Sequence, residues 1–423
     1  MFPHFIVQGG KWLEGETRIN GAKNAALKSM AASLLFKDKL VIENIPLVED
    51  IKRMSELLEN LGADIKIEGK TMIINPEKVG GKDIDPEIAK KIRASVVLTG
   101  PILAREKEVF FPHPGGCVIG KRPIDFFIEG WSAMGANIEE TKSGYRIESQ
   151  HMRGAEIVFK NISVTATETL MMTAVLAKGK TILKNAACEP EIPALAEFLN
   201  QCGASIKGAG THTIEIEGTE GTLLESRGKA IKTIPDRIET GSFLVLGSLL
   251  GKPIKITECS PEDIAVPIAI LEQAGVEIEK GGDWLRVTAA KRLKSVDIKT
   301  KEYPGFPTDL QSPFAVLMTQ AEGECMVFET VFEGRLNYVE DLNRMGATIT
   351  TCDPHRVLVR GKTELRGREI ESPDIRAGLA FLIAAMTAKG ESKVGNIYQI
   401  DRGYERIEER LNALGASIQR VKS

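Results

Sequence analysis

Apolar residues follow a recurring pattern around glycine in this chain. An apolar residue stands four positions before the glycine and an isoleucine three positions after it, as in LLENLGADI, FLNQCGASI and LNALGASI. Apolar residues four and one positions before the glycine lie on one face of a helix, and glycine readily takes the left-handed conformation that ends a helix. The pattern therefore predicts a helix, a glycine cap and then a strand.

The pattern occurs six times at regular intervals. Its glycines are Gly62, Gly135, Gly203, Gly275, Gly346 and Gly415. Successive glycines are 68 to 73 residues apart. Self-similarity at a fixed period is the signature of an internal repeat, so we expect six copies of one structural unit.

Each unit also contains a stretch that is apolar nearly all round, such as RIETGSFLVLGSLLG or RAGLAFLIAAMTA. These stretches begin 38 to 42 residues before the closing glycine. A helix without a polar face is buried inside its domain. Short β-rich runs such as KLVIENI and KTILKNA lie between the two helices, so the unit is predicted to be βαβαββ.

Six such units are too many for one core and too long for an open solenoid, whose repeats typically span about 20 to 45 residues. We therefore predict an α/β fold with two globular domains of three units each, built around the buried helices. The chain is expected to cross between the domains near residue 230, at SRGKAIKT. The N-terminal strand FIVQGG could complete either domain.

Composition and charge narrow the class of protein. The longest apolar runs, such as GLAFLIAAM, are shorter than the roughly 18 residues that cross a bilayer, and the start MFPHFIVQGG lacks the features of a signal peptide. Lys and Arg total 55 against 58 Asp and Glu, a net charge of −3, with both signs mixed along the chain. We expect a soluble cytoplasmic protein that binds neither nucleic acid nor membrane.

Sequence motifs for metals and common cofactors are missing. The six cysteines have no CxxC spacing, which predicts free thiols, and the five histidines have no ligand spacing. The chain has no P-loop signature, no GxGxxG after a strand and no GxSxG. Metal, nucleoside triphosphate, dinucleotide and serine-hydrolase sites are therefore not indicated, and no cofactor is expected.

Four of the six buried helices begin with a basic residue, namely Lys23, Arg93, Arg237 or Arg376. A cation at a helix N-terminus meets the positive end of the helix dipole, which costs roughly a few tenths of a kcal/mol. Free N–H groups and added cations at this position form a strong site for phosphate or carboxylate. We hypothesise that these helix starts face a cleft that binds a highly anionic ligand. In the alternative, each cation is separately ion-paired and structural.

The stretch HPGGCVIGKRPID, residues 113–125, combines glycines, a cysteine and two cations. Cys117 follows two glycines, which make the backbone mobile, and precedes Lys121 and Arg122, which favour a thiolate. The stretch indicates a thiol on a moving loop beside an anion. In the alternative, it is a surface turn with an incidental cysteine.

Several motifs resemble those of the enolpyruvyl transferases, and in particular of the members that act on UDP-N-acetylglucosamine. They are GAKNAAL, PGGCVIGKRPID, IPDRIETG, YPGFPTD, SPDIRAG and IDRGYERIEERLNALGA. The resemblance runs nearly end to end. It implies two inverted α/β domains, each of three βαβαββ units around buried helices, with the active site in the cleft between them. Residues 22–230 would form one domain, with a mobile loop at about 112–123, and residues 1–21 with 231–423 the other.

The reaction that the resemblance implies is transfer of the enolpyruvyl group of phosphoenolpyruvate to the 3-hydroxyl of UDP-N-acetylglucosamine. Proton addition at the methylene carbon creates an electrophile, the hydroxyl adds to give a tetrahedral intermediate, and loss of a proton and phosphate restores the alkene. The reaction uses no metal or organic cofactor. It is the first committed step of bacterial peptidoglycan synthesis, on which the cell wall, cell shape and division depend, and it is sensitive to fosfomycin.

The resemblance also implies roles for individual residues. Cys117 would donate the proton to phosphoenolpyruvate, and Asp309 would accept the proton of the sugar hydroxyl; Lys23 and Arg402 complete the catalytic set. The implied phosphoenolpyruvate contacts are Lys23, Arg93, Arg122, Arg376 and Arg402. The implied nucleotide-sugar contacts are Asn24, Arg93, Arg122, Pro123, Ile124, Asp125, Phe126, Ser163, Val164, Asp309 and Val331.

Three positions depart from the family pattern. Lys28 stands where proline is usual and is expected to affect only its helix; Asn161 replaces lysine and Thr165 replaces glycine in the segment expected to hold the diphosphate. The rival enzyme is 3-phosphoshikimate 1-carboxyvinyltransferase, whose lysine motif reads more like GDKSISHR and which has no PGGC loop. The other alternative is a non-catalytic regulator that binds the nucleotide sugar. The sequence predicts no oligomeric state.

Overall fold

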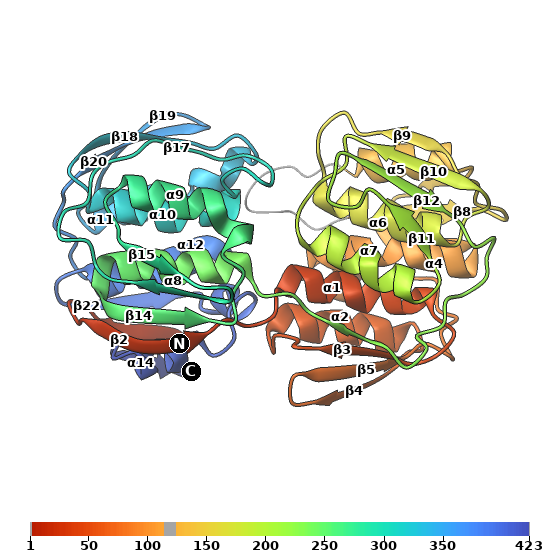
Figure 1. Cartoon of the computed structure of the whole chain (residues 1–423), viewed down its shortest axis with the longest axis horizontal. Coiled ribbons are helices and arrows are strands. Elements are labelled where there is room, and N and C mark those ends of the chain that lie inside the picture. Colours follow the sequence, from red (N-terminus) through yellow and green to blue (C-terminus); the bar gives the residue numbers. More distant parts are fainter. Residues whose placement is uncertain (1, 114–123, 423) are drawn as a thin grey trace. The chain divides into compact units, whose positions relative to one another are not determined.

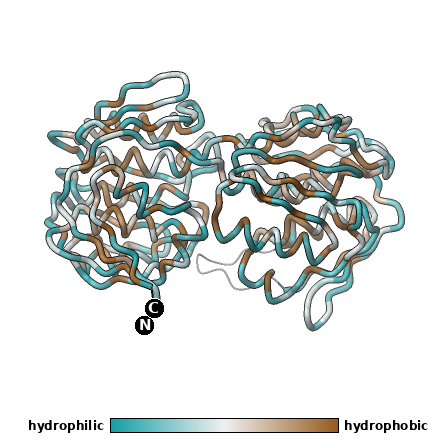
Figure 2. The backbone as a smooth tube through the Cα atoms, turned by 90° about the horizontal axis from the view of Figure 1, so that it is seen from below, coloured by the Kyte–Doolittle hydropathy of each residue, from teal (hydrophilic) through white to brown (hydrophobic). Residues whose placement is uncertain are grey.

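The computed structural model describes residues 2–113 and 124–422 (Figure 1). The chain forms two compact units: residues 21–113 with 124–234, here called the N-terminal unit, and residues 2–20 with 235–422, here called the C-terminal unit. Each unit has its own hydrophobic core. In Figure 2 the apolar stretches run through the middle of each unit, whereas polar segments follow the outer loops.

Three inner helices form the centre of the N-terminal unit. They are α1 (Lys23–Ala32), the 3-10 turn η2 (Arg93–Leu98) continued by α4 (Thr99–Glu106), and α6 (Val164–Val175). The outer helices are α2 (Glu49–Asn60), α5 (Asp125–Ala133) and α7 (Glu191–Gln201), with a short helix α3 (Pro86–Ala89) and a turn η1 (Ser33–Leu35).

The described part of the N-terminal unit contains three sheets, one for each repeat. Their strand orders are β13-β3-β5-β4, β6-β8-β7 and β11-β12-β10-β9. The strands are β3 (Leu40–Glu43), β4 (Asp64–Glu68), β5 (Thr71–Asn75), β6 (Glu108–Pro112), β7 (Asn137–Glu140), β8 (Gly144–Glu148), β9 (Glu156–Val158), β10 (Lys180–Lys184), β11 (Ser205–Lys207), β12 (Thr213–Glu217) and β13 (Ala230–Lys232).

The C-terminal unit repeats this plan. Its inner helices are α8 (Arg237–Leu250), η4 (Thr308–Leu310) continued by α10 (Gln311–Thr319), and α12 (Ile375–Thr387). Its outer helices are η3 (Glu262–Ile264) with α9 (Ala265–Gln273), η5 (Glu333–Leu336) with α11 (Val339–Arg344), α13 (Tyr398–Asp401) and α14 (Ile407–Ala413).

Three sheets are likewise described in the C-terminal unit. Their orders are β15-β16-β14-β2, β17-β18-β20-β19 and β21-β22-β1-β23. The strands are β1 (His4–Gln8), β2 (Leu13–Arg18), β14 (Gly251–Thr257), β15 (Ile278–Lys280), β16 (Trp284–Val287), β17 (Ile298–Lys299), β18 (Gly323–Phe328), β19 (Thr348–Asp353), β20 (Arg356–Gly361), β21 (Glu369–Glu371), β22 (Glu391–Gly395) and β23 (Ile418–Val421).

Strands from outside the repeats complete three of the sheets. β1 pairs antiparallel with β22 and β23, and β2 pairs in parallel with β14, so the N-terminal strands complete the C-terminal unit. β13 pairs in parallel with β3, so it closes the N-terminal unit. For this reason the chain passes between the units after residue 234, slightly beyond the crossing expected near residue 230.

The six repeat glycines cap their helices as the sequence predicted. All six have positive φ angles, between 91° and 109°. In each repeat the backbone N–H of the residue after the glycine donates to the carbonyl of the apolar residue that stands four positions before the glycine, at 2.9–3.1 Å. The N–H of the glycine itself donates to the carbonyl of the residue three positions before the glycine. These are the two hydrogen bonds of a Schellman motif, which satisfies carbonyls at the helix end.

Three repeats add an asparagine clip to this cap. Asn200, Asn343 and Asn412 each donate to the carbonyl of the isoleucine six residues later and accept its N–H, at 2.7–2.9 Å. The clip fixes the start of the strand to the helix end, and the asparagine that makes it follows leucine in all three motifs. The five described cysteines are free, and no helix in the described ranges is long and apolar enough to span a bilayer.

Candidate active site

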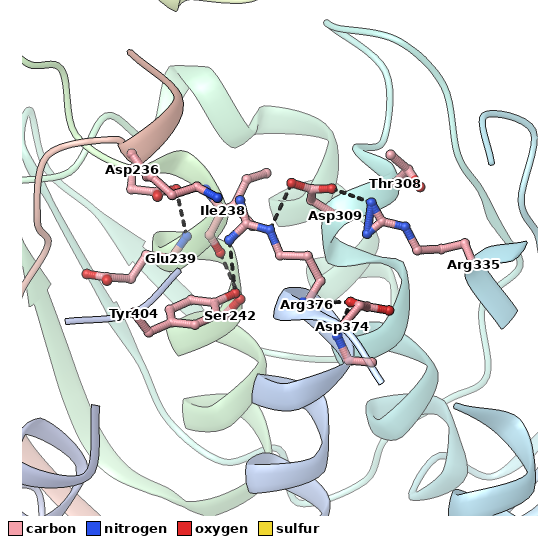
Figure 3. Close-up of polar contacts among 12 residues, drawn as sticks. Asp236, Ile238, Glu239, Ser242, Thr308, Asp309, Arg335, Asp374, Arg376 and Tyr404 are labelled. Carbon is pink, nitrogen blue, oxygen red and sulfur yellow. Dashed lines mark hydrogen bonds and ion pairs between the residues drawn. The ribbon is translucent and has the colours of Figure 1, made fainter. Parts of the chain in front are cut away.

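The inner helices of the C-terminal unit bring three predicted residues together at their N-terminal ends. Asp309 lies in η4, Arg376 is the second residue of α12, and Arg237 begins α8. These helices pack against one another. Figure 3 shows Asp309 between two guanidinium groups, those of Arg376 and Arg335. The cluster therefore collects charges from all three repeats of the unit.

Each oxygen of the Asp309 carboxylate accepts a hydrogen bond from one arginine. Nε of Arg376 lies 2.9 Å from Oδ2, and Nη2 of Arg335 lies 2.7 Å from Oδ1. Both arginine side chains are almost fully buried, whereas the Asp309 side chain keeps 23% of its surface exposed. The carboxylate is thus held rigidly but can still be reached by a ligand.

The environment of Asp309 favours its ionised form. Burial alone would raise the pKa of this carboxyl group, but the charges of Arg376 and Arg335 outweigh burial and hold its pKa well below the usual range. Such a carboxylate is always ready to accept a proton but is a weak base. Its basicity rises if an anion draws one of the arginines away.

Arg376 has further contacts that fix its position. Its backbone N–H donates to the side chain of Asp374, the N-cap of α12, at 2.8 Å, and Nη1 donates to the hydroxyl of Tyr404 at 3.1 Å. Although burial opposes its charge, the attraction of Asp309 raises the pKa of Arg376 well above its ordinary value. The SPDIRAG and DRGY motifs are therefore in direct contact, through Arg376 and Tyr404.

The DRGY turn packs closely against α12. A Cβ atom on Gly403 would lie 2.3 Å from a methyl group of Ile375, so only glycine permits this approach. Arg402 directly precedes this glycine, is half-buried and donates from Nη1 to Oε1 of Gln399 at 3.0 Å. The turn thus places Arg402 next to the start of the helix that carries Arg376.

The predicted residues of the N-terminal unit also lie at helix starts. Lys23 begins α1, and its Nζ donates to Oδ2 of Asp50 at 2.8 Å, with both side chains buried. Asn24 follows it and is half-buried. Arg93 begins η2, which packs against both α1 and α6. Lys23 and Asn24 on α1 and Arg93 on η2 therefore lie on elements that pack against each other.

The start of α6 and the start of α5 contribute the remaining described positions. Ser163 is the N-cap of α6 and accepts the N–H of Ala166 at 3.3 Å, and Val164 follows it. Ile124 is buried as the N-cap of α5, Asp125 is exposed, and the ring of Phe126 meets that of Phe159 edge to face at 6.3 Å. Val331 is half-buried in the loop before η5 of the other unit. Cys117, Arg122 and Pro123 lie outside the described residues.

Of the three departures from the family pattern, Asn161 is exposed and Thr165 is half-buried. The expectation that Lys28 affects only its helix is wrong. Its Nζ lies 3.0 Å from Oε2 of Glu168 on α6, and both side chains are buried. Burial outweighs the charge of Lys28 and raises the pKa of Glu168 to about 8. Lys28 thus links two inner helices.

Two of the basic helix starts are ion-paired, Lys23 with Asp50 and Arg376 with Asp309, as the structural alternative also expects. Arg237 lies over the ring of Tyr303, 5.4 Å from its centre. Binding of an anion by these helix starts stays a prediction. Ion pairing does not preclude it, since an anion can replace a carboxylate as the partner of a buried cation.

Sequence reasoning missed three members of these clusters, Asp50, Arg335 and Tyr404. Tyr404 lies within the quoted DRGY motif, so its place in the motif was a usable signal. Arg335 lies four residues after Val331, in a stretch without a distinct pattern. Nothing local marks Asp50 as the partner of Lys23, because the two belong to different helices.

Comparison with known proteins places the chain and its fold in a known class. Residues 7–411 match the family model described as EPSP synthase (3-phosphoshikimate 1-carboxyvinyltransferase). The enolpyruvyl transferase NikO from Streptomyces tendae has the same fold, with a TM-score of 0.90 at 23% identity over 100% of this chain and 99% of that one. EPSP synthase from Acinetobacter baumannii gives a TM-score of 0.76 at 17% identity, over 99% of this chain and 100% of that one. The chain belongs to the EPSP synthase family, a family of enolpyruvyl transferases.

Curated relatives narrow the class. The UDP-N-acetylglucosamine 1-carboxyvinyltransferase of Solibacter usitatus is 43% identical over 422 residues, which cover 99% of both chains. The protein of the same name from Campylobacter jejuni is 42% identical over 416 residues, covering 98% of this chain and 99% of that one. Within the enolpyruvyl transferases, the chain therefore belongs with the UDP-N-acetylglucosamine 1-carboxyvinyltransferases, and it is a transferase.

Proposed function

We propose that this chain transfers the enolpyruvyl group of phosphoenolpyruvate to the 3-hydroxyl of UDP-N-acetylglucosamine and releases phosphate. The observation that carries the proposal is the end-to-end match, at 42–43% identity, to relatives named for this reaction. The cluster around Asp309 supports it, because the chemistry needs an acid, a base and fixed cations for two anionic substrates. On this basis the enzyme works in the cytoplasm at the start of cell-wall synthesis.

Asp309 is the proposed base for the sugar hydroxyl. Its partly exposed carboxylate is ionised, so it can accept the proton that the hydroxyl loses on attack. Its two ion pairs weaken it as a base until the carboxylate of phosphoenolpyruvate engages Arg376. Arrival of the second substrate would then raise the pKa of Asp309 and prepare it to take the proton.

The basic side chains are the proposed electrostatic partners of phosphoenolpyruvate. We assign the phosphate to Lys23, Arg122 and Arg402 and the carboxylate to Arg376 and Arg402, with Arg93 in the same group. Lys23 and Arg376 are buried and already oriented by Asp50 and Asp309, so they lose little side-chain freedom when they bind an anion. Fixed cations of this kind stabilise the charge that develops on the departing phosphate.

Cys117 is the proposed donor of the proton to the methylene carbon. The assignment rests on its PGGC motif. The nucleotide sugar is assigned to Asn24, to positions 122–126, to Ser163 and Val164, and to Asp309 and Val331. The proposal needs neither a metal nor an organic cofactor, because protonation by the thiol activates the substrate in place of a Lewis acid.

The rival function is that of a 3-phosphoshikimate 1-carboxyvinyltransferase. The name of the family model alone would permit it, but the solved EPSP synthase shares only 17% identity, which shows the fold and not the substrate. A non-catalytic regulator is also less supported, because every motif-borne catalytic residue is present in the sequence.

Phosphate release by the purified protein decides among these functions. The proposal predicts release with phosphoenolpyruvate and UDP-N-acetylglucosamine together, and none when shikimate 3-phosphate replaces the nucleotide sugar. The Asp309→Asn variant, which keeps an acceptor oxygen for Arg335, is the negative control. Release only with shikimate 3-phosphate would establish the rival enzyme, and binding of the nucleotide sugar without release would establish the regulator.

A further inference from the structure

Glu329 is a completely buried acidic residue directly after β18, and no role in the reaction is assigned to it above. Its carboxylate accepts four hydrogen bonds at 2.8–3.1 Å. The donors are the backbone N–H groups of Val331 and Phe332 and the hydroxyls of Thr300 and Thr308. A buried carboxylate with four donors is fully satisfied, so it holds its neighbours in fixed positions.

Three of the four donors lie on two separate segments of the candidate active site. Thr308 binds Oε2 at 2.8 Å and directly precedes Asp309, the proposed base. Val331 and Phe332 bind Oε1 at 2.8 and 3.0 Å and lead into η5, which carries Arg335. One carboxylate therefore fixes both the base and the loop that delivers one of its arginine partners.

The backbone of Glu329 is anchored as firmly as its side chain. Its N–H donates to the carbonyl of His355 at 2.8 Å, and its own carbonyl lies 2.9 Å from Nδ1 of His355. His355 lies between β19 and β20 of the same sheet. The carboxylate thus projects from a fixed point of the sheet rather than from a free loop.

We propose that Glu329 is a positioning residue that orients Asp309 through Thr308 and orients Val331 and Arg335 through their shared loop. The inference rests on the proposed function, because it takes Asp309 as the base and Val331 as a nucleotide-sugar contact. Displacement of a catalytic group by about 1 Å can cost roughly 100-fold in rate. Loss of Glu329 should therefore lower the turnover rate well beyond its effect on folding.

Three substitutions separate positioning from packing. In Glu329→Gln, Oε1 still accepts both backbone N–H groups, and the Thr308 hydroxyl can turn to accept from the new amide. In Glu329→Leu, the volume is kept but two N–H groups and two hydroxyls lose their acceptor. Thr308→Val removes only the link to Asp309 and keeps the shape of the side chain. The matched control is Glu408→Leu, which removes a buried carboxylate of the same unit that pairs with Arg420 on β23.

Steady-state kinetics and thermal unfolding of these variants of the full chain test the inference. We expect Glu329→Leu to lower kcat about 100-fold and to raise the KM for UDP-N-acetylglucosamine, and Glu329→Gln to stay within about tenfold of the wild type. Thr308→Val should lower kcat with little change in KM. In the double variant Glu329→Leu with Thr308→Val, the kcat losses should not add, because each substitution removes the bond between Thr308 and Glu329. Glu408→Leu should lose stability but keep kcat.

Distinct outcomes would overturn the inference. Equal kcat in Glu329→Leu and Glu408→Leu would make Glu329 merely structural. If Glu329→Leu does not fold, the Thr308→Val variant decides, and a wild-type kcat in it would overturn the link to Asp309. Failure of the wild-type enzyme to turn over UDP-N-acetylglucosamine would instead contradict the proposed function itself.

Discussion

Arg376 and Asp309 are 67 residues apart in the chain, yet Nε of Arg376 lies 2.9 Å from Oδ2 of Asp309. The pair joins the starts of the inner helices of two successive repeats. A buried ion pair adds little net stability, because the loss of hydration offsets the attraction between the charges. We therefore propose that the pair serves the chemistry of the site.

Replacement of Asp309 should stop turnover. Both Asp309→Ala and Asp309→Asn lose the proposed base, while the proposed contacts of the nucleotide sugar on the N-terminal unit remain. Asp309→Ala also leaves Arg335 and Arg376 without their carboxylate, which should cost up to about 3 kcal/mol of unfolding free energy. Activity, calorimetric binding of UDP-N-acetylglucosamine and thermal unfolding measure these effects. Wild-type turnover in either variant would eliminate the assignment of the base.

Anions should rescue the Asp309→Ala variant. Two arginines without their carboxylate form a site for phosphate, so added inorganic phosphate should raise the melting temperature of the variant more than that of the wild type. Sodium chloride at equal ionic strength is the control for screening. Equal shifts in both proteins would show that the arginines do not bind the anion.

Arg402→Ala should damage catalysis far more than folding. Arg402 is half-buried and donates to Gln399, so its loss removes little packing, but it removes a cation assigned to phosphoenolpyruvate. A contact of this kind is worth about 2–3 kcal/mol, or 30- to 150-fold in kcat/KM. The control is Arg105→Ala, which removes a largely buried arginine that donates to the carbonyls of Leu34, Phe36 and Pro76 and should lower stability at unchanged kcat. A similar loss of stability in both variants, with little loss of activity in Arg402→Ala, would make Arg402 structural.

The raised pKa of Glu168 predicts a pH dependence of stability. In the unfolded chain this carboxyl group titrates near 4.5, and in the folded chain near 8. Between these values the folded state holds the extra proton, so its unfolding free energy falls as pH rises from about 4.5 to about 8. Glu168→Gln removes this contribution. Denaturant unfolding at several pH values should therefore show a flatter profile for the variant, and identical profiles would contradict the shifted pKa.

Cys117 should be the cysteine that fosfomycin modifies. Burial raises the pKa of the thiols of Cys188 and Cys202, that of Cys259 to about 11 and that of Cys325 to about 12, which makes all four poor nucleophiles. Exposed Cys352 should react with iodoacetamide but not with fosfomycin, because fosfomycin needs a cationic site to orient its epoxide.

Peptide mapping after treatment with each reagent identifies the cysteine that the reagent has modified. Cys117→Asp should retain turnover, because a carboxyl group can donate the proton, but it should resist fosfomycin because it is a poorer nucleophile. Cys117→Ala should lose most turnover. A fosfomycin adduct on any of the five described cysteines, or full activity of Cys117→Ala, would refute the loop-cysteine mechanism.

The repeat architecture was predictable because it depends on local sequence patterns. Apolar spacing before Gly62, Gly135 and their four counterparts sets the helix face, and a glycine at positive φ ends the helix whatever lies nearby. The apolar stretches without a polar face likewise reveal the inner helices. Hence the number of repeats, their order and most helix starts followed from the sequence.

Partners on different helices and loops were not predictable in this way. The pairing of Asp309 with Arg335 and of Lys23 with Asp50, and the bonds of Glu329 to the hydroxyls of Thr300 and Thr308, depend on which elements meet in three dimensions. No local pattern encodes these meetings. Lys28 illustrates the limit, because its departure from the family pattern was visible in the sequence but its partner Glu168 lies on a helix 140 residues further on. The strand FIVQGG was placed only when β1 was seen to pair with β22 and β23.

Identification of the product tests the central claim most directly. The purified wild-type enzyme is incubated with phosphoenolpyruvate and UDP-N-acetylglucosamine, and the nucleotide products are analysed by mass spectrometry and by NMR. We predict a nucleotide sugar whose 3-oxygen carries an enolpyruvyl ether, formed in equal amount with phosphate and not formed by Asp309→Asn. Recovery of unchanged UDP-N-acetylglucosamine under conditions where the protein is folded and binds it would contradict the account.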